Sequence, residues 1–369
     1  MRKNLAFILF SILLVSCENT QKLLKSNNTK YKYTVAMDRF NRGKYFQAVP
    51  VIEHLLPLYK GTDTGEMLYF TLAEAYFKND EFLVAAYHYK NYRELYSTNP
   101  KAEDALFKSA LCYYYESPRH PLDQTETKNA IDNLQLFINE YPNSSKIPEG
   151  NIYMAKLRRK LELKAYDAAK LYYRTQNYRA AGVSFRNLIK EFPDIAEAEE
   201  AVYLATKSDY YFAENSVAYK QPERFIQASQ SANEFYNKYP TSVYTKEIQE
   251  IQEKAYFYTI KSAYDWGQSA FFDKRIEGFN AAIDNYRDYF SNLKIQKDID
   301  NANMIVEKSY QNIVKTNYDL GEEAKSEGDR RNRYEAAVKA YLLYIEKYPN
   351  RASKDLETMY LKASEKIKI

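Results

Sequence analysis

Glycine, proline, tryptophan, cysteine and histidine are all scarce in this chain, which has 9 Gly, 11 Pro, 1 Trp, 2 Cys and 3 His in 369 residues. Few glycines and prolines, and no stretch of alternating apolar and polar residues, argue against a protein built of short strands and turns. The three scattered histidines do not have the spacing of metal ligands, and no Gly-rich phosphate loop is present. We therefore expect no enzyme and no cofactor.

Long apolar runs are also missing, apart from one from Leu5 to Val15. This run follows two basic residues and is too short to span a bilayer, but it has the length of a signal-peptide core. Leu14 to Ser16 and the following Cys17 resemble the lipobox of bacterial lipoproteins, whose cysteine is acylated and becomes the first residue of the mature chain. An ordinary secretory cleavage site beside an incidental cysteine is the alternative. We expect a signal peptide over residues 1–16 and a palmitate-bearing anchor at Cys17.

Charge of one sign is not in excess either, because the formal net charge is only +4. Loss of two basic residues with the signal peptide would leave 51 Lys and Arg against 49 acidic residues. A nearly neutral chain does not favour a large basic surface that contacts the phosphate backbone of a nucleic acid. No nucleic-acid partner is therefore expected. The remaining cysteine, Cys112, has no partner for a disulfide and is expected to be a buried, small apolar residue.

Aromatic residues are abundant, with 38 Tyr and 19 Phe, and they recur beside alanine at fixed offsets. The offsets are those of a tetratricopeptide repeat, and they are clearest at Ala169, Tyr172, Tyr178, Ala181, Phe185 and Pro193. Seven roughly collinear copies have an inner alanine, namely Ala48, Ala85, Ala130, Ala181, Ala228, Ala282 and Ala337. Their irregular spacing predicts an all-α fold, an irregular tetratricopeptide-repeat superhelical solenoid, with a longer helix near residues 147–176.

The physical basis of the pattern is close helix packing. Alanine lets two antiparallel helices approach, and the aromatic residue four positions later covers the crossing. An aromatic-proline pair then ends the second helix, because the residue before proline is disfavoured in the helical conformation. These pairs are Tyr141-Pro142, Phe192-Pro193, Tyr239-Pro240 and Tyr348-Pro349.

Three blocks of sequence have a more specific resemblance. They begin with Ala36-Met-Asp-Arg-Phe-Asn-Arg-Gly-Lys-Tyr-Phe-Gln-Ala, Ala73-Glu-Ala-Tyr-Phe-Lys-Asn-Asp and Phe137-Ile-Asn-Glu-Tyr-Pro-Asn-Ser, the last followed by a long helix from Lys156. Together with the lipobox they resemble the BamD family of outer-membrane assembly lipoproteins. The resemblance implies a periplasm-facing platform that docks the periplasmic domains of the BamA barrel and helps deliver unfolded outer-membrane proteins.

The resemblance divides the mature chain into three parts. Residues 17–32 are polar and are expected to be a lipidated tether, and residues 33–240 carry the BamD-like repeats. Residues 241–369 supply additional helical repeats where a typical family member has already ended. This extension leaves open whether the chain is an orthologue with a longer scaffold or a paralogue with another task.

Candidate partner-binding residues are Tyr76, Tyr113 and Tyr114, which lie on predicted first helices. First helices usually line the concave face of a repeat array, where peptides or partner domains bind. The alternative role of these tyrosines is packing between repeats. Two alternative functions also remain: a glycan-binding lipoprotein related to SusD, and a general envelope scaffold. The lone Trp266 and the few glycines do not favour sugar binding.

Overall fold

The computed structural model describes residues 20–368, and within that range every regular element is a helix. The expected all-α class is confirmed. The helices are α2 (Thr29–Asn41), α3 (Tyr45–Leu55), α4 (Asp63–Lys78), α5 (Phe82–Leu95), α6 (Lys101–Glu116), α7 (Thr125–Glu140), α8 (Ile147–Arg174), α9 (Tyr178–Glu191), α10 (Ala198–Glu214), α11 (Gln221–Lys238), α12 (Thr245–Ser269), α13 (Asp273–Tyr289), α14 (Gln296–Glu323), α15 (Glu327–Lys347) and α16 (Lys354–Ile367). Short 3₁₀ turns lie at Leu56–Tyr59, Ala218–Lys220 and Phe290–Asn292. No helix among the described residues is long and apolar enough to cross a membrane.

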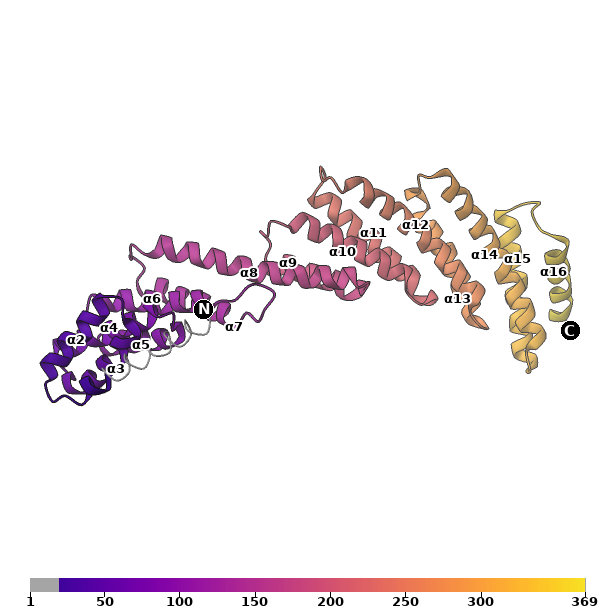
Figure 1. Cartoon of the computed structure of the whole chain (residues 1–369). Coiled ribbons are helices and arrows are strands. Elements are labelled where there is room, and N and C mark those ends of the chain that lie inside the picture. Colours follow the sequence, from indigo (N-terminus) through magenta and orange to yellow (C-terminus); the bar gives the residue numbers. More distant parts are fainter. Residues whose placement is uncertain (1–19, 369) are drawn as a thin grey trace, which may run out of the picture. The chain divides into compact units, whose positions relative to one another are not determined.

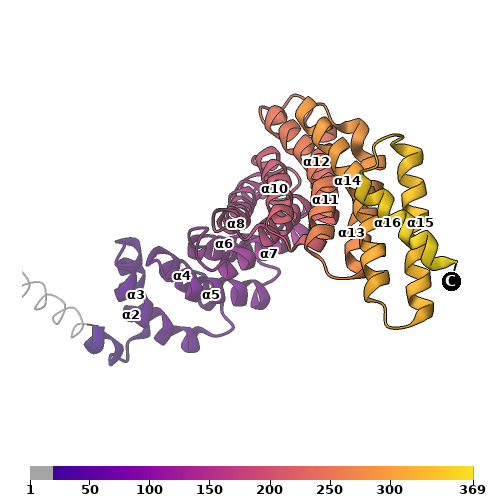
Figure 2. The same ribbon diagram turned by 90° about the vertical axis from the view of Figure 1, so that its right-hand side faces the viewer.

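The chain forms two compact units, which divide between Lys164 and Ala165, within α8. In each unit, helices that follow one another in sequence pack against one another, as the α4–α5 and α12–α13 pairs do. Figures 1 and 2 show this succession in the second unit, where α10 to α16 lie side by side in chain order. Because each helix contacts mainly its sequence neighbours, the fold is a set of tetratricopeptide-like helix pairs.

The seven inner alanines confirm the predicted register of the repeats. Each lies on the second helix of a pair, and each is at most 1% exposed. A fully buried alanine leaves room for the first helix of the same pair to approach closely. Cys112 is also fully buried and free, as expected.

The four aromatic residues before proline end their helices in the same way. Tyr141, Phe192, Tyr239 and Tyr348 follow α7, α9, α11 and α15, with φ between −125° and −133° and ψ between 63° and 73°. The N–H of each donates to the carbonyl four residues earlier, so the last helical hydrogen bond is kept. The backbone then leaves the helical conformation at the residue that proline restricts.

Three of the turns inside the helix pairs share one geometry. Gly43, Asp80 and Gln176 each have φ between 59° and 72° and precede α3, α5 and α9 by two residues. The next N–H donates back to the carbonyl five residues earlier, for example from Asn177 to Tyr172 at 2.9 Å. This is the hydrogen bond of a helix end closed by a left-handed residue, which turns the chain sharply into the second helix.

The abundance of tyrosine over tryptophan has a structural reason. Tyrosine rings pack between helices while their hydroxyl groups donate to glutamate carboxylates on a different helix. The pairs are Tyr76–Glu53, Tyr89–Glu74, Tyr92–Glu66, Tyr203–Glu247, Tyr334–Glu322 and Tyr344–Glu307. Each pair satisfies a polar atom at the edge of an otherwise apolar contact, so both units use the same link between helices.

The N-terminal segment differs from the expected polar tether over residues 17–32. Residues 20–24 are helical, Leu23 is buried in the core formed by α2, α3 and α4, and α2 already begins at Thr29. Lys32 is also buried, and its Nζ donates to Nε2 of His54 at 2.9 Å. The apolar side chains of Leu23 and Leu24 explain the difference, because they gain by packing on α2 and α3. Residues 17–19, including Cys17, lie outside the described residues.

Candidate functional site

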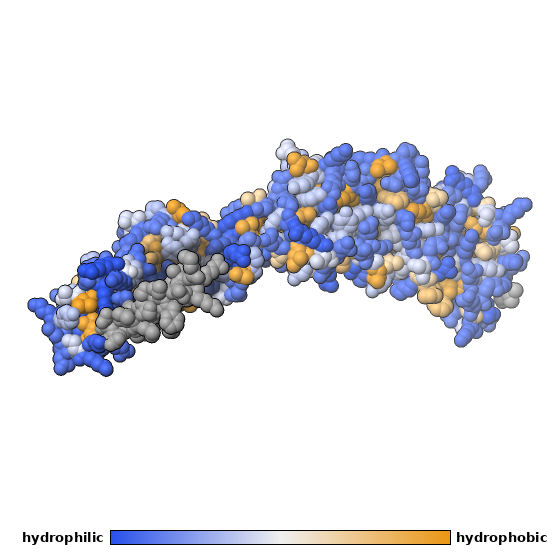
Figure 3. Space-filling view, viewed as in Figure 1, coloured by the Kyte–Doolittle hydropathy of each residue, from blue (hydrophilic) through white to orange (hydrophobic). Residues whose placement is uncertain are grey.

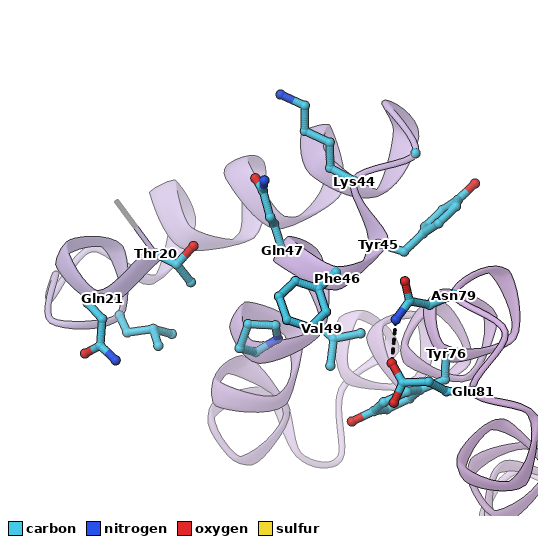
Figure 4. A pocket seen from close by; sticks show the side chains of 13 residues that line it. Thr20, Gln21, Lys44, Tyr45, Phe46, Gln47, Val49, Tyr76, Asn79 and Glu81 are labelled. Carbon is cyan, nitrogen blue, oxygen red and sulfur yellow. Dashed lines mark hydrogen bonds between the residues drawn. The ribbon is translucent and has the colours of Figure 1, made fainter. Parts of the chain in front are cut away.

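The first unit contains a cleft of about 580 Å³ between residues 20–24, the N-terminal half of α3 and the turn between α4 and α5. Figure 4 shows Phe46 and Val49 facing Tyr76 across this cleft. Its apolar wall consists of Leu24, Tyr45, Phe46, Val49, Pro50 and Tyr76. Polar groups stand at the margin: Thr20, Gln21, Lys44, Gln47, Asn79 and Glu81. An apolar wall with a few polar groups at its rim suits the binding of a peptide or another partly apolar ligand.

The local sequence of α3 opens this cleft. Pro50 lies inside the helix and has no N–H, so it cannot donate to the carbonyl of Phe46 as other helical residues would. Phe46 itself is 77% exposed, although Ala48 and Ile52 on the same helix are fully buried. Helix α3 therefore presents two faces, one in the core and one at the cleft.

Tyr76 is held rigidly at the far side of the cleft. Its hydroxyl group donates to Oε1 of Glu53 at 2.6 Å, and its ring stacks on His88 with centroids 5.2 Å apart and planes 5° from parallel. Burial, and then the neighbouring Glu53 carboxylate, raise the pKa of Tyr76 above its usual range. Burial lowers the pKa of His88, so its ring is neutral at pH 7. Tyr76 therefore offers an uncharged aromatic wall.

Tyr113 and Tyr114 do not line this cleft. Tyr113 is half-buried between the core of α4, α5 and α6 and the core of α6, α7 and α8, and burial raises its pKa. The ring of Tyr114 lies 4.5 Å from that of Tyr153, centroid to centroid, and the Nζ of Lys160 lies 5.8 Å from its centre. Of the three tyrosines, the structure brings only Tyr76 to the cleft. Contact of any of them with a partner stays a prediction.

Most of the cleft is formed by residues that the sequence pattern did not indicate. Its wall comes largely from a second helix, α3, rather than from the first helices, and from residues 20–24, which were expected to be tether. A signal was present: Phe46 and Pro50 are four residues apart, so they share a helix face that the buried Ala48 does not occupy. A second apolar face on a short helix indicates that this face also packs against another part of the chain or a partner.

The histidines have separate environments. His54 accepts a hydrogen bond from Lys32, His88 stacks on Tyr76, and His120 lies in the loop between α6 and α7. Among residues 20–368 no three His, Cys, Asp or Glu side chains lie close enough to hold a metal ion.

Two further hollows lie in the second unit, within the region expected to be an extension. One of about 680 Å³ is lined by residues that include Tyr286 and Tyr348, and one of about 420 Å³ by residues that include Tyr258 and Tyr264. Both include Met304 of α14, which is 46% exposed. The two hollows thus meet at Met304 on α14, and each has two tyrosines in its lining.

Known proteins resemble this chain in sequence. A family model described as "YfiO: Outer membrane lipoprotein" matches residues 25–213 and, a second time, residues 159–326. The outer membrane protein assembly factor BamD of Vibrio cholerae is 21% identical over 210 residues, which are 54% of this chain and 87% of that protein. BamD of Caulobacter vibrioides is 20% identical over 171 residues, 46% of this chain, and the match spans only 56% of that relative's length.

Among solved structures, the tetratricopeptide domain of P58(IPK) is 16% identical with a TM-score of 0.31, covering 78% of this chain and 68% of that one. The family match is the stronger finding, since it covers more than half of the chain and its second part runs into the region after residue 240. The resemblance found in the sequence is confirmed: the chain belongs to the YfiO family of outer membrane lipoproteins, whose named relatives here are BamD proteins.

Proposed function

We propose that this lipoprotein is a scaffold of the barrel assembly machinery, which docks the periplasmic domains of a BamA-type barrel protein and helps insert outer-membrane proteins. The observation that carries the proposal is the family match over residues 25–213, together with relatives whose name is outer membrane protein assembly factor. Helix pairs that expose grooves to partners suit a scaffold rather than a catalyst.

Different repeats of the chain have different roles in this scaffold. The N-terminal repeats accept extended apolar segments of unfolded outer-membrane proteins on the face lined by their first helices, where Tyr115 of α6 is 49% exposed. The repeats from Tyr172 to Pro240 dock the barrel protein, and the hollows around Met304 add contact area. A chain that ends at Tyr239, the residue that closes α11, keeps barrel binding, whereas residues 241–369 alone do not bind.

The anchor is proposed to be Cys17, with the repeats on the periplasmic side of the outer membrane. A Cys17→Ala variant should remain an unprocessed precursor that does not incorporate labelled palmitate, while the parent chain is labelled. Palmitate labelling that persists in Cys17→Ala would remove this assignment.

The assembly role is tested by crosslinking in cells. A photo-crosslinkable residue at Tyr115, on the first helix α6, should capture unfolded outer-membrane protein precursors. The same residue at Leu361, which is 55% exposed on α16, is the control and should not capture them. Depletion of the protein should also lower the amount of assembled barrels. Normal barrel levels after depletion, with glycan-uptake defects instead, would favour the SusD-like alternative.

A further inference from the structure

Charge is distributed unevenly along this chain. Residues 20–60 contain eight Lys and Arg against two acidic residues, a net charge of +6, whereas residues 61–369 contain 43 Lys and Arg against 46 acidic residues, a net charge of −3. The segment of residues 20–60, which includes α2 and α3, therefore stands out as basic in a chain that is otherwise slightly acidic. A basic block of this kind indicates an anionic partner.

Several of these basic side chains are available to such a partner. Lys25, Lys30, Lys44 and Lys60 are exposed, and none of them has an ion-pair partner in the described part of the chain. Their charge is not neutralised within the fold. By contrast, Arg42 is paired with Asp38 at 2.9 Å.

The N-terminal end of this basic segment is held in place by hydrogen bonds. Nη1 of Arg39 donates to Oγ1 of Thr20 at 3.1 Å and to the carbonyl of Gln47 at 2.9 Å, and Leu23 is buried in the adjoining core. Thr20 is therefore tied to the start of α3. Cys17 is three residues earlier, and three extended residues span at most about 11 Å. A lipid on Cys17 must enter its membrane within that distance of Thr20.

An exposed aromatic residue lies in the same place. Phe46 is 77% exposed and lines the cleft together with Leu24. Figure 4 shows Lys44 and Thr20 around the same cleft. On the face shown in Figure 3, apolar residues are scattered over a mostly hydrophilic surface. Basic residues beside an exposed aromatic ring are typical of protein surfaces that lie at a membrane interface.

We propose that the segment of residues 20–60, which includes α2 and α3, lies against anionic lipid headgroups of the membrane that holds the anchor, with Phe46 at the interface. The acyl chains retain the protein, and the basic segment fixes the orientation in which the following repeats are presented. Lipid phosphates are the proposed partner for two reasons. The segment carries a net positive charge, and its first residue, Thr20, lies within a short distance of Cys17 and therefore of the membrane surface. The proposal rests on the proposed anchor at Cys17 and not on the assembly role.

The test uses the full mature chain without its lipid, as a Cys17→Ser variant, and vesicles of phosphatidylcholine with or without phosphatidylglycerol. This protein should sediment with the anionic vesicles and not with the neutral ones, and high salt should abolish the binding. Replacing Lys25, Lys30 and Lys44 together by Glu should weaken binding by about tenfold or more. The matched control replaces Lys354, Lys362 and Lys368 of the C-terminal region, which are also exposed, and should change binding by less than about twofold.

A second readout locates the contact. In a Trp266→Phe background, Phe46→Trp should show a blue-shifted emission with anionic vesicles, and Phe271→Trp, at a residue 80% exposed in the second unit, should not. Circular dichroism establishes that every variant is folded. The proposal is overturned if the parent chain does not prefer anionic vesicles, if the two lysine triplets weaken binding equally, or if Phe46→Trp does not shift.

Discussion

The two compact units close their helix pairs with different small residues. Both use a buried alanine on the second helix, but the second unit adds glycine where helices touch. A Cβ on Gly278 of α13 would lie 2.4 Å from the backbone nitrogen of Gly267 on α12, and one on Gly321 of α14 would lie 2.8 Å from the ring of Tyr334 on α15. In the first unit, a Cβ on Gly150 of α8 would meet nothing nearer than 3.8 Å, and Gly65 approaches the preceding 3₁₀ turn rather than another helix.

This difference shows which residues every helix pair needs and which residues differ from pair to pair. The inner alanine and the aromatic residue four positions later recur throughout, so they define the pair. Glycine at a crossing brings two backbones into direct contact, which shortens the interaxial distance for that pair alone. A side chain added at a crossing that lacks both Cβ atoms must push the two backbones apart.

The tyrosine–glutamate links, which the units share, predict the largest effect. Burial first, and then the hydrogen bond to Glu247, raise the pKa of Tyr203 in the second unit to about 12. Burial and then the Glu74 carboxylate raise the pKa of Tyr89 in the first unit above its usual range. An unfolded tyrosine ionises near pH 10, so the folded state loses stability as pH rises from about 10 through 12. The melting temperature should be nearly constant from pH 7 to 9 and fall steeply above about pH 10. A melting temperature that stays constant to about pH 12 would contradict the burial of these hydroxyl groups.

The second largest effect is expected from a large side chain at the buried alanine of a helix crossing. Ala181 is fully buried on α9, so Ala181→Trp should destabilise the second unit by about 3 kcal/mol or more. Val183 lies two residues on and is 48% exposed, so Val183→Trp is the control and should change stability by less than about 0.5 kcal/mol. Thermal unfolding followed by circular dichroism measures both. If Ala181→Trp melts like the parent chain, the register assigned to this repeat is wrong.

The glycine difference itself gives a smaller pair of effects, opposite in sign. Gly278→Ala forces the backbones of α12 and α13 apart and should cost about 1–3 kcal/mol. Gly150 lies inside α8, and the Cβ added by Gly150→Ala would be in ordinary contact with Phe107 and Leu134. This variant should stabilise the folded state by about 0.5–1 kcal/mol. Urea unfolding of the two variants compares them directly. Equal effects would show that glycine does not distinguish the units.

The sequence predicted the parts of the fold that depend on a repeated spacing. Alanine and aromatic offsets located the second helices, and the aromatic-proline pairs located their ends, because each acts within one turn of helix. The glycine crossings were not predicted, since nothing in the sequence shows which residue of a neighbouring helix Gly278 meets. The packing of Leu23 was missed for a similar reason: a single apolar residue in a polar stretch is significant only once α2 and α3 provide a core.

Prediction of the candidate site was less complete. Tyr76 was identified and lies at the cleft, whereas Tyr113 and Tyr114 fill the contacts between helix pairs. The repeat pattern places all three on first helices, but it does not distinguish a tyrosine that faces a groove from one that faces the next pair. The wall formed by Phe46 and Pro50 depends on α3 packing beside residues 20–24, a contact that a periodic pattern cannot reveal.

The most direct test of the assembly role is co-purification. The full-length lipoprotein, tagged at its C-terminus, is extracted from membranes with a mild detergent and its bound proteins are identified. The account predicts a barrel protein with periplasmic domains, recovered with the parent chain in amounts comparable to the lipoprotein itself. Recovery of glycan-uptake or secretion components without such a barrel protein would contradict it.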